Sequence, residues 1–191
     1  TLTPSAPHSV RLTKSTEKAS GQLLPLRLLV IHVLQDGLQR IAAPLGPEQA
    51  NRARLLQGLW CDLRLSKLNP AQESPPPNVP FVLVVDQSAG DCSIALGLAG
   101  PSCFQQMLRE ALRDHPDCTV VVKVHPDVIR GRARGHFRRC DLQHPRIHLC
   151  ADGLHPAALL EQARAVYVVT SQMGFEALLW GKPVHCFGMP F

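Results

Sequence analysis

Residues 166–183 read VYVVTSQMGFEALLWGKP, and the organisation of the chain is interpreted outward from this stretch. Its first four residues are β-branched or aromatic, which favours a strand covered on both faces. Thr170 and Ser171 are good N-cap residues for a following helix. Gly181 can end that helix in the left-handed conformation, and Pro183 prevents it from resuming. The stretch therefore predicts a strand, a polar turn and a helix.

The polar turn in this stretch is a candidate anion site. A helix that begins at the carboxyl end of a parallel strand directs N–H groups and partial positive charge at the crevice. Thr170, Ser171 and Gln172 lie at that point. Gly174 would let a ligand approach the backbone, and Glu176 could accept hydrogen bonds from a sugar diol. An ordinary capped β-α unit without a ligand fits the same pattern, so the pattern alone leaves both open.

Composition limits the classes of function. The 191 residues are 45% hydrophobic and 18% charged, which is typical of a globular chain that buries a core. The formal net charge is +5, which favours anionic ligands or an anionic membrane surface without requiring either. Aromatic residues are only 5%, so no stacking platform accompanies the charge, and we expect no nucleic-acid partner.

The seven cysteines and the hydropathy pattern suggest a location. The cysteine number is odd and no C-x-x-C pair occurs, so we expect no metal site and a reducing cytoplasm. No apolar run reaches the roughly 18–20 residues that span a bilayer, and no signal peptide is recognisable. The chain lacks an initiator methionine and stops directly after a predicted strand, so we expect a fragment.

Proline-rich and periodic segments predict the domain organisation. Residues 1–22 are expected to be disordered or loosely ordered. Residues 23–70 are expected to form a hairpin plus a helix, as a partial preceding domain. The predicted hairpin strands are 28–34 and 38–42, and the helix is 48–68 with an apolar stripe. Residues 71–80 are expected to be an extended proline-rich linker.

From residue 81 onward, strands and helices alternate. Apolar runs predict five strands, and amphipathic segments predict helices at 101–114, 156–164 and within 166–183. The predicted strands are 81–85, 119–124, 146–150, 166–169 and 184–187. Repeated β-α-β units with near-continuous apolar strands predict an α/β fold, a Rossmann-like doubly wound parallel sheet over residues 81–191. Asp86, Asp91, His125 and Ser171 all follow predicted strands.

Each candidate residue at these strand ends has a functional and a structural interpretation. Asp86 and Asp91 flank a glycine-bearing turn, where a carboxylate can act as nucleophile, base or helix cap. His125 follows Lys123 and is restricted by the proline after it, so it could hydrogen-bond a phosphate or simply be solvated. The arginine-rich residues 130–139 are either a solvated loop or a clamp for an anionic group. No Walker loop, dinucleotide fingerprint, nucleophile elbow or zincin motif is present.

Three segments together resemble a known family. They read VVDQSAGDCSI at 84–94, VKVHPDV at 122–128 and VTSQMGFEAL at 169–178. They resemble the bacterial capsular polysaccharide synthesis and export proteins of the KpsC/LipB type. The stretch GKPVHCFGMPF at 181–191 extends the similarity, which covers about residues 25–191.

The resemblance implies a retaining β-Kdo transferase, with residues 81–191 as the nucleotide-binding half of a GT-B glycosyltransferase. The donor would be CMP-Kdo, an activated eight-carbon acidic sugar, and no other cofactor is implied. The acceptor would be a lipid-linked Kdo chain on a phosphatidylglycerol-type lipid. The partners and location implied are the capsule assembly and export machinery and the cytoplasmic face of the inner membrane, where the protein would be peripheral.

The resemblance also implies roles for individual residues. Asp91, at the Gly-Asp-x-Ser position, would be the nucleophile, and His125 would contact the CMP phosphate or the Kdo carboxylate. The other implied nucleotide-sugar-binding residues are Lys123, Thr170, Ser171, Gln172, Gly174 and Glu176. Of these, the three polar residues that open the helix would hold the phosphate, and Glu176 would bind ribose.

The family's acidic-Gly segment, the expected acid/base, is not recognisable here. Alternatives are a non-catalytic capsule assembly or export component with the same fold, and a GT-B transferase that uses another nucleotide sugar.

Overall fold

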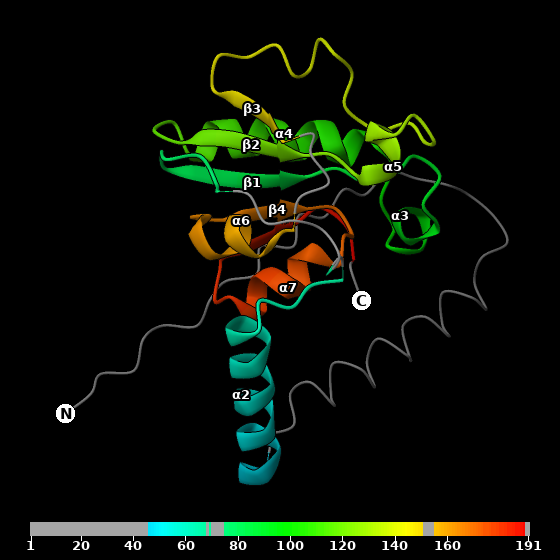
Figure 1. Ribbon diagram of the computed structural model, residues 1–191. Coiled ribbons are helices and arrows are strands. Elements are labelled where there is room, and N and C mark those ends of the chain that lie inside the picture. Colours follow the sequence, from blue (N-terminus) through cyan, green and yellow to red (C-terminus); the bar gives the residue numbers. More distant parts are fainter. Residues whose placement is uncertain (1–45, 68, 70–74, 151–154, 190–191) are drawn as a thin grey trace, which may run out of the picture. The chain divides into compact units, whose positions relative to one another are not determined.

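The sheet is parallel throughout, and apolar clusters pack on both of its faces. A computed structural model describes residues 46–67, 69, 75–150 and 155–189. Five strands pair in the order β3-β2-β1-β4-β5, and every pair is parallel (Figure 1). The strands are β1 (Phe81–Val85), β2 (Thr119–Lys123), β3 (Ile147–Cys150), β4 (Val166–Val168) and β5 (Val184–Cys186).

The three inner strands, β1, β2 and β4, are buried because helices cover both faces of the sheet, whereas the edge strands β3 and β5 are partly exposed. All five residues of β1 are buried, as expected for a central parallel strand. One face packs against α4 (Pro101–Asp114), which buries Phe104, Met107, Leu108 and Ala111. The other packs against α6 (Ala157–Gln162) and α7 (Met173–Leu179), through Leu159, Leu160 and Ala177. The expected doubly wound α/β architecture is therefore confirmed.

Two short helices fill connections in which the sequence predicts only turns. They are α3 (Cys92–Leu96), between β1 and α4, and α5 (Pro126–Ile129), after β2. The predicted helix 101–114 agrees with α4 at both ends. The predicted strands agree with the observed ones to within one residue at each end.

The helix α2 (Pro47–Asp62) confirms the helical period predicted at 48–68, although it is shorter. Its predicted apolar stripe is not buried: no residue of α2 is buried, and Leu56 and Leu59 are more than half exposed. Among the described residues, those up to Leu59 and those from Trp60 onward belong to two different compact units, and the second unit holds the sheet. The division between them precedes the proline-rich linker, 71–80, at which the sequence predicts the boundary. The predicted hairpin lies outside the described residues.

The end of α7 shows why the opening stretch folds as predicted. Gly181 has a φ of 68°, in the left-handed region. Its N–H donates to the Leu178 carbonyl at 3.0 Å, and the Lys182 N–H donates to the Ala177 carbonyl at 3.0 Å. This pair of bonds is a Schellman motif, which satisfies carbonyls at the end of the helix. The chain then enters β5.

Candidate functional site

A cavity of about 290 Å³ lies at the carboxyl ends of β1, β2 and β4. In the strand order 3-2-1-4-5, β1 and β4 are neighbours whose outgoing connections run to opposite sides. This is the switch point at which open α/β sheets bind ligands. Its polar lining includes Asp91, Lys123, His125, Ser171, Gln172 and Glu176. With Thr170, seven predicted site residues from three distant segments therefore line one cavity.

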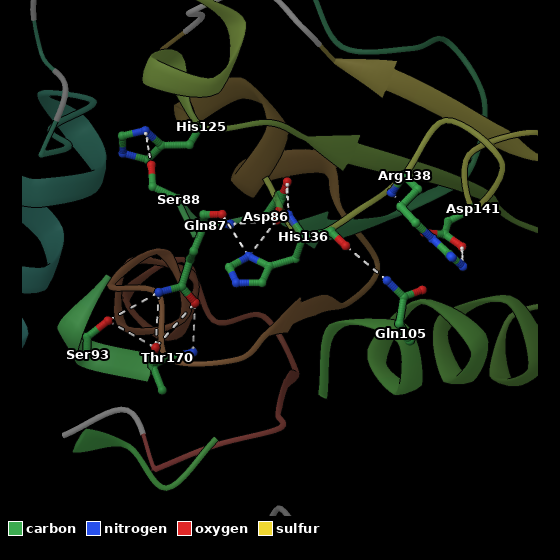
Figure 2. Close-up of polar contacts among 10 residues, drawn as sticks. All are labelled: Asp86, Gln87, Ser88, Ser93, Gln105, His125, His136, Arg138, Asp141 and Thr170. Atoms are coloured by element: carbon green, nitrogen blue, oxygen red, sulfur yellow. Dashed lines mark hydrogen bonds and ion pairs between the residues drawn. The ribbon is translucent and has the colours of Figure 1, made fainter. Parts of the chain in front are cut away.

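The loop after β1 and the loop after β4 are joined by one buried amide. The Gln87 Oε1 atom accepts from the Thr170 N–H at 3.0 Å, and its Nε2 donates to the Thr170 Oγ1 at 3.0 Å (Figure 2). The same Nε2 lies 3.3 Å from the Ser93 Oγ, which is 3.1 Å from the Thr170 Oγ1. Gln87 and Thr170 are both buried. The predicted phosphate-binding hydroxyl of Thr170 is thus engaged in holding the two loops together.

A second buried group, Asp86, ties the arginine-rich loop to the sheet. Its carboxylate accepts from the His136 N–H at 3.2 Å and from the Gln87 N–H at 2.9 Å. The His136 Nδ1 lies 2.9 Å from the Gln87 carbonyl (Figure 2). The His136 ring stacks on Phe104, with ring centroids 3.7 Å apart. Burial raises the pKa of Asp86, and the two N–H donors oppose that rise. A Cβ on Gly135 would collide with this carboxylate, so the loop needs glycine there.

Asp91 differs from Asp86 in exposure and in the direction of its pKa shift. It is the N-cap of α3, and its Oδ1 accepts from the Ser93 N–H at 2.9 Å. That hydrogen bond lowers the pKa of Asp91, so its carboxylate is ionised at neutral pH. Asp91 is exposed and lines the cavity, whereas Asp86 is almost fully buried. Of the two aspartates, Asp91 is the more accessible and the one whose pKa is lowered, which is what a nucleophile requires.

The hydrogen bonds of His125 define its tautomer. The Asp127 N–H donates to the His125 Nδ1 at 3.2 Å, so this nitrogen carries no proton in the neutral ring. The Ser88 Oγ is also 3.2 Å from the same nitrogen (Figure 2). The proton of the neutral imidazole is therefore on Nε2, which is a hydrogen-bond donor. His125 lines the cavity as a donor, and this suits an anionic group.

Lys123 supplies a buried amine at the end of β2. The residue is 4% exposed and lines the cavity. Burial lowers the pKa of Lys123, because an ammonium ion loses its hydration in this position. An anion bound in the cavity would favour the charged form of the amine. The protonation of the Lys123 amine would therefore depend on whether an anionic ligand occupies the cavity.

Glu176 joins α7 to the segment that follows α2. It is 1% exposed, and its Oε2 accepts from the Ser66 hydroxyl at 2.7 Å. Its Oε1 is 3.4 Å from the Lys67 N–H and has further acceptor capacity. Ser66, Lys67 and Glu176 all line the cavity. The carboxylate predicted to bind ribose therefore also accepts a structural hydrogen bond from Ser66.

The start of α7 differs in detail from the predicted anion site. The Ser171 hydroxyl accepts from the Met173 N–H at 3.3 Å, and the Gly174 N–H donates to the Ser171 carbonyl at 2.9 Å. Two of the backbone N–H groups at the start of α7 therefore already have acceptors within the protein. The role predicted for Gly174 is corrected by its position, because it is buried and does not line the cavity. A Cβ there would lie 2.9 Å from a methyl of Val168, so glycine serves helix–strand packing.

Gln87 and Ser66 were not singled out from the sequence, and His136 was noted only as part of the arginine-rich loop. Gln87 and His136 act through contacts with residues more than 40 positions away, and Ser66 meets Glu176 from a different region of the chain. The only local signal is that Gln87 directly follows a predicted strand. Among the described residues, no cluster of three or more His, Cys, Asp or Glu side chains is placed to hold a metal ion.

All seven cysteines are free. Within the described ranges, no helix combines the length and the apolar character needed to cross a bilayer.

Residues 30–191 match the family described as "Capsule polysaccharide biosynthesis protein". The chain belongs to this family. Two curated relatives are the capsule polysaccharide modification protein LipA of Neisseria meningitidis serogroup A, 43% identical over 151 residues, and the lipopolysaccharide-processing protein LpsZ of Rhizobium meliloti, 33% identical over 145 residues. The matches cover 75% and 73% of this chain, but only 21% and 33% of those proteins. The predicted relationship to KpsC/LipB-type capsule proteins is confirmed.

Solved structures confirm the fold class. The chain matches KpsC of Thermosulfurimonas dismutans, a beta Kdo 2,4 transferase, with 38% identity and a TM-score of 0.69. That match covers 77% of this chain and 47% of the KpsC chain. A beta Kdo 2,7 transferase chain of the same KpsC, 24% identical with a TM-score of 0.54, has the same fold. The α/β unit is therefore the Rossmann-like part of a GT-B fold. The chain spans about a fifth of the length of the LipA relatives that it matches.

Proposed function

We propose that this chain is the nucleotide-sugar-binding part of a retaining β-Kdo transferase that builds the Kdo linker of a capsular polysaccharide. The observation that carries the proposal is the cavity at the switch point, where Asp91, Lys123 and His125 meet the start of α7. The similarity to a beta Kdo 2,4 transferase supports the choice of sugar. The donor is CMP-Kdo with no further cofactor, and the acceptor is a lipid-linked Kdo chain on a phosphatidylglycerol-type lipid.

The proposed reaction begins at Asp91. One oxygen of its ionised carboxylate forms a bond to the anomeric carbon of Kdo as the bond from that carbon to the CMP phosphate oxygen breaks. The electron pair leaves with CMP. An acceptor hydroxyl then attacks the same carbon, the bond to Asp91 breaks, and the hydroxyl proton passes to a base. Two inversions at one carbon give net retention.

The remaining residues of the cavity bind the donor in this proposal. The Nε2–H of His125 donates to the CMP phosphate or the Kdo carboxylate. Lys123 offsets the negative charge that develops on the leaving phosphate. Ser171 and Gln172 hold the phosphate at the start of α7, with Thr170 fixing that loop through Gln87. The free acceptor capacity of Glu176 serves the ribose hydroxyls.

In this proposal the transfer reaction takes place at the cytoplasmic face of the inner membrane, to which the protein binds peripherally. The membrane holds the lipid-linked acceptor, and the capsule assembly and export machinery would receive the product. The net charge of +5 is consistent with an anionic surface.

The first test is calorimetric titration of the complete protein that contains this chain with CMP, and with UMP and GMP as controls. We expect selective CMP binding that weakens about tenfold or more in His125→Ala, because a hydrogen bond to a charged group is lost. Glu176→Gln is expected to weaken CMP binding more than Ser66→Ala, which removes the hydroxyl that donates to Glu176 and leaves the carboxylate in place. Equal binding of the three nucleotides would contradict the assignment of the donor.

The second test separates an enzyme from a non-catalytic assembly component. Asp91→Asn is expected to reduce Kdo transfer by at least about a thousandfold, because the nucleophile is removed, while CMP affinity stays near the wild-type value. Asp86→Asn is the comparison, since its carboxylate is buried and structural. Full transfer by Asp91→Asn would remove Asp91 from the mechanism, and CMP binding without any transfer in the wild-type protein would favour the assembly component.

A further inference from the structure

The loop from Arg130 to Arg139, named here the arginine loop, has features that the proposed donor site does not use. It contains five arginines, Arg130, Arg132, Arg134, Arg138 and Arg139, and all five are exposed. Arg138 pairs with Asp141 at 3.1 Å. Among the described residues, no carboxylate forms an ion pair with the other four guanidinium groups. Four like charges on one short segment repel one another unless an anion is bound.

The backbone of the arginine loop is held against the walls of the cavity. The Ala89 N–H donates to the Arg134 carbonyl at 2.6 Å, next to Ser88 and the His125 ring. The Arg132 N–H donates to the Asp127 carbonyl at 2.8 Å. His136 is fixed by Asp86, and its carbonyl accepts from the Gln105 side chain at 3.0 Å (Figure 2). The backbone that carries these charges is thus fixed beside the residues that line the cavity.

The exposed surface of this loop suits acidic groups more than acyl chains. Phe137, its one aromatic residue, packs against the core beneath α4 and forms an edge contact with Phe104. What the loop exposes is mostly guanidinium, a planar donor that binds carboxylates and phosphates in a bidentate manner. A segment that inserts into a membrane would instead expose its apolar side chains. A polyanionic chain is therefore the better match.

We propose that Arg130, Arg132 and Arg134 bind the carboxylates of the acceptor, a saccharide chain with one acidic group per sugar. This inference rests on the proposed function, because a growing Kdo chain carries such a carboxylate on each residue. The loop and the donor cavity share a wall, so the acceptor is held beside the donor while its end reaches the reacting carbon. Affinity then rises with the number of acidic sugars, and salt weakens it.

The test measures equilibrium binding of synthetic acceptors with one, two or three Kdo residues on a neutral fluorescent group. The same acceptors with methyl-esterified carboxylates serve as the uncharged probe. The loop variant is Arg130→Gln/Arg132→Gln/Arg134→Gln in the complete protein, which keeps the backbone contacts of the loop. The matched control is Arg52→Gln/Arg54→Gln/Arg109→Gln, which removes three exposed charges from helices.

We expect the loop variant to bind the trisaccharide about tenfold more weakly, since three exposed charge pairs are lost. The control variant should bind as the wild type does, and the CMP affinity of both should be unchanged. The ester should bind weakly to all three proteins. Unchanged acceptor affinity in the loop variant, or an equal loss in the control, would overturn the proposal.

Two further outcomes separate this inference from its alternatives. If the loop variant keeps acceptor affinity but loses binding to phosphatidylglycerol vesicles relative to phosphatidylcholine vesicles, the loop contacts a membrane and the acceptor proposal is overturned. If the wild-type protein does not bind CMP, yet the loop variant loses affinity for the acidic trisaccharide, the acidic-saccharide site is supported and only the proposed transferase function fails.

Discussion

A single side chain, Gln87, holds together the two loops that form most of the candidate site. Its amide makes hydrogen bonds with the Thr170 N–H, the Thr170 hydroxyl and the Ser93 hydroxyl. Ser93 in turn donates its N–H to Asp91. The position of the proposed nucleophile and the start of α7 therefore depend on one buried amide, which contacts no ligand in the proposed mechanism. Gln87 is a positioning residue.

Replacement of Gln87 by methionine tests this dependence at the residue scale. Methionine has a similar length but leaves the buried Thr170 N–H without its acceptor, so we expect a loss of about 1–3 kcal/mol in the free energy of unfolding. Urea denaturation measures this loss. We also expect kcat to fall more than the KM for CMP-Kdo rises, because the nucleophile is misplaced while donor contacts remain.

The matched control for this prediction is Ser93→Ala, which removes the contacts of the Ser93 hydroxyl with the Gln87 amide at 3.3 Å and with the Thr170 hydroxyl at 3.1 Å, and keeps the amide itself. It should cost less stability than Gln87→Met. Equal stability of Gln87→Met and the wild type would show that the two loops do not depend on the amide.

Whether the sequence predicts a contact in the site depends on how far apart the two contacting residues lie in the chain. The cap formed by Asp91 with Ser93 is local, so an Asp-x-Ser pattern at the end of a strand predicts it. The contact of Gln87 with Thr170 joins residues 83 positions apart, and that of Ser66 with Glu176 joins residues 110 apart. Such contacts depend on how the strands are ordered in the sheet, which the strand pattern alone does not determine.

At the scale of elements, the packing of α7 on β4 requires a residue without a side chain. A Cβ on Gly174 would lie 2.9 Å from a methyl of Val168 and 3.4 Å from one of Val184. Gly174→Ala gains about 1 kcal/mol of helix propensity but overpacks the interface, which costs about 1–3 kcal/mol. We expect net destabilisation of up to about 2 kcal/mol, measured by urea denaturation.

The double variant Gly174→Ala/Val168→Ala shows whether this collision is the cause. Removing the Val168 methyl groups makes room for the new Cβ, so the double variant should be more stable than the sum of the two single changes predicts. Additive effects would mean that the glycine is required for another reason.

The elements themselves were predicted with unequal success, and the reason is physical. The helix α4 has an apolar stripe over 14 residues and a proline at its start, so both ends follow from the sequence. The helix α3 has only five residues, too few for a period to be recognised. The apolar period of α2 predicted a helix correctly, but the burial that it also predicted is wrong, because no residue of that helix is buried.

At the scale of the whole folded unit, a cluster of aromatic rings links the stability of the sheet to pH. The His185 ring stacks on Tyr167 at a centroid distance of 4.3 Å, and His115 meets the edge of the same tyrosine at 5.9 Å. Burial lowers the pKa of His185, and the neighbouring His115 lowers it further, whereas Asp114 and Glu110 oppose the shift. Burial also lowers the pKa of His115.

These shifts determine the sign of the pH dependence. In the unfolded chain both histidines titrate near 6.5, whereas in the folded chain they bind protons only at lower pH. Between those values the unfolded state binds more protons, so the free energy of unfolding falls as the pH decreases. The stabilisation is complete above about pH 7.5 and is lost as the pH falls through 6.5 toward the folded pKa values. Asp86, whose pKa is raised, contributes in the opposite direction.

The variant His185→Phe separates the contribution of His185 to the pH dependence of the free energy of unfolding from the contribution of Asp86. Phenylalanine keeps a ring stacked on Tyr167 but has no proton to bind, so the variant should lose less stability than the wild type between about pH 7.5 and 5.5. Urea midpoints measured across this range provide the comparison. The curve of the wild type should be steeper on its acid side, and the two curves should run parallel above about pH 7.5, where both proteins carry neutral rings. Parallel curves over the whole range would show that His185 contributes nothing to the linkage and that the loss of stability comes from carboxylates or His115.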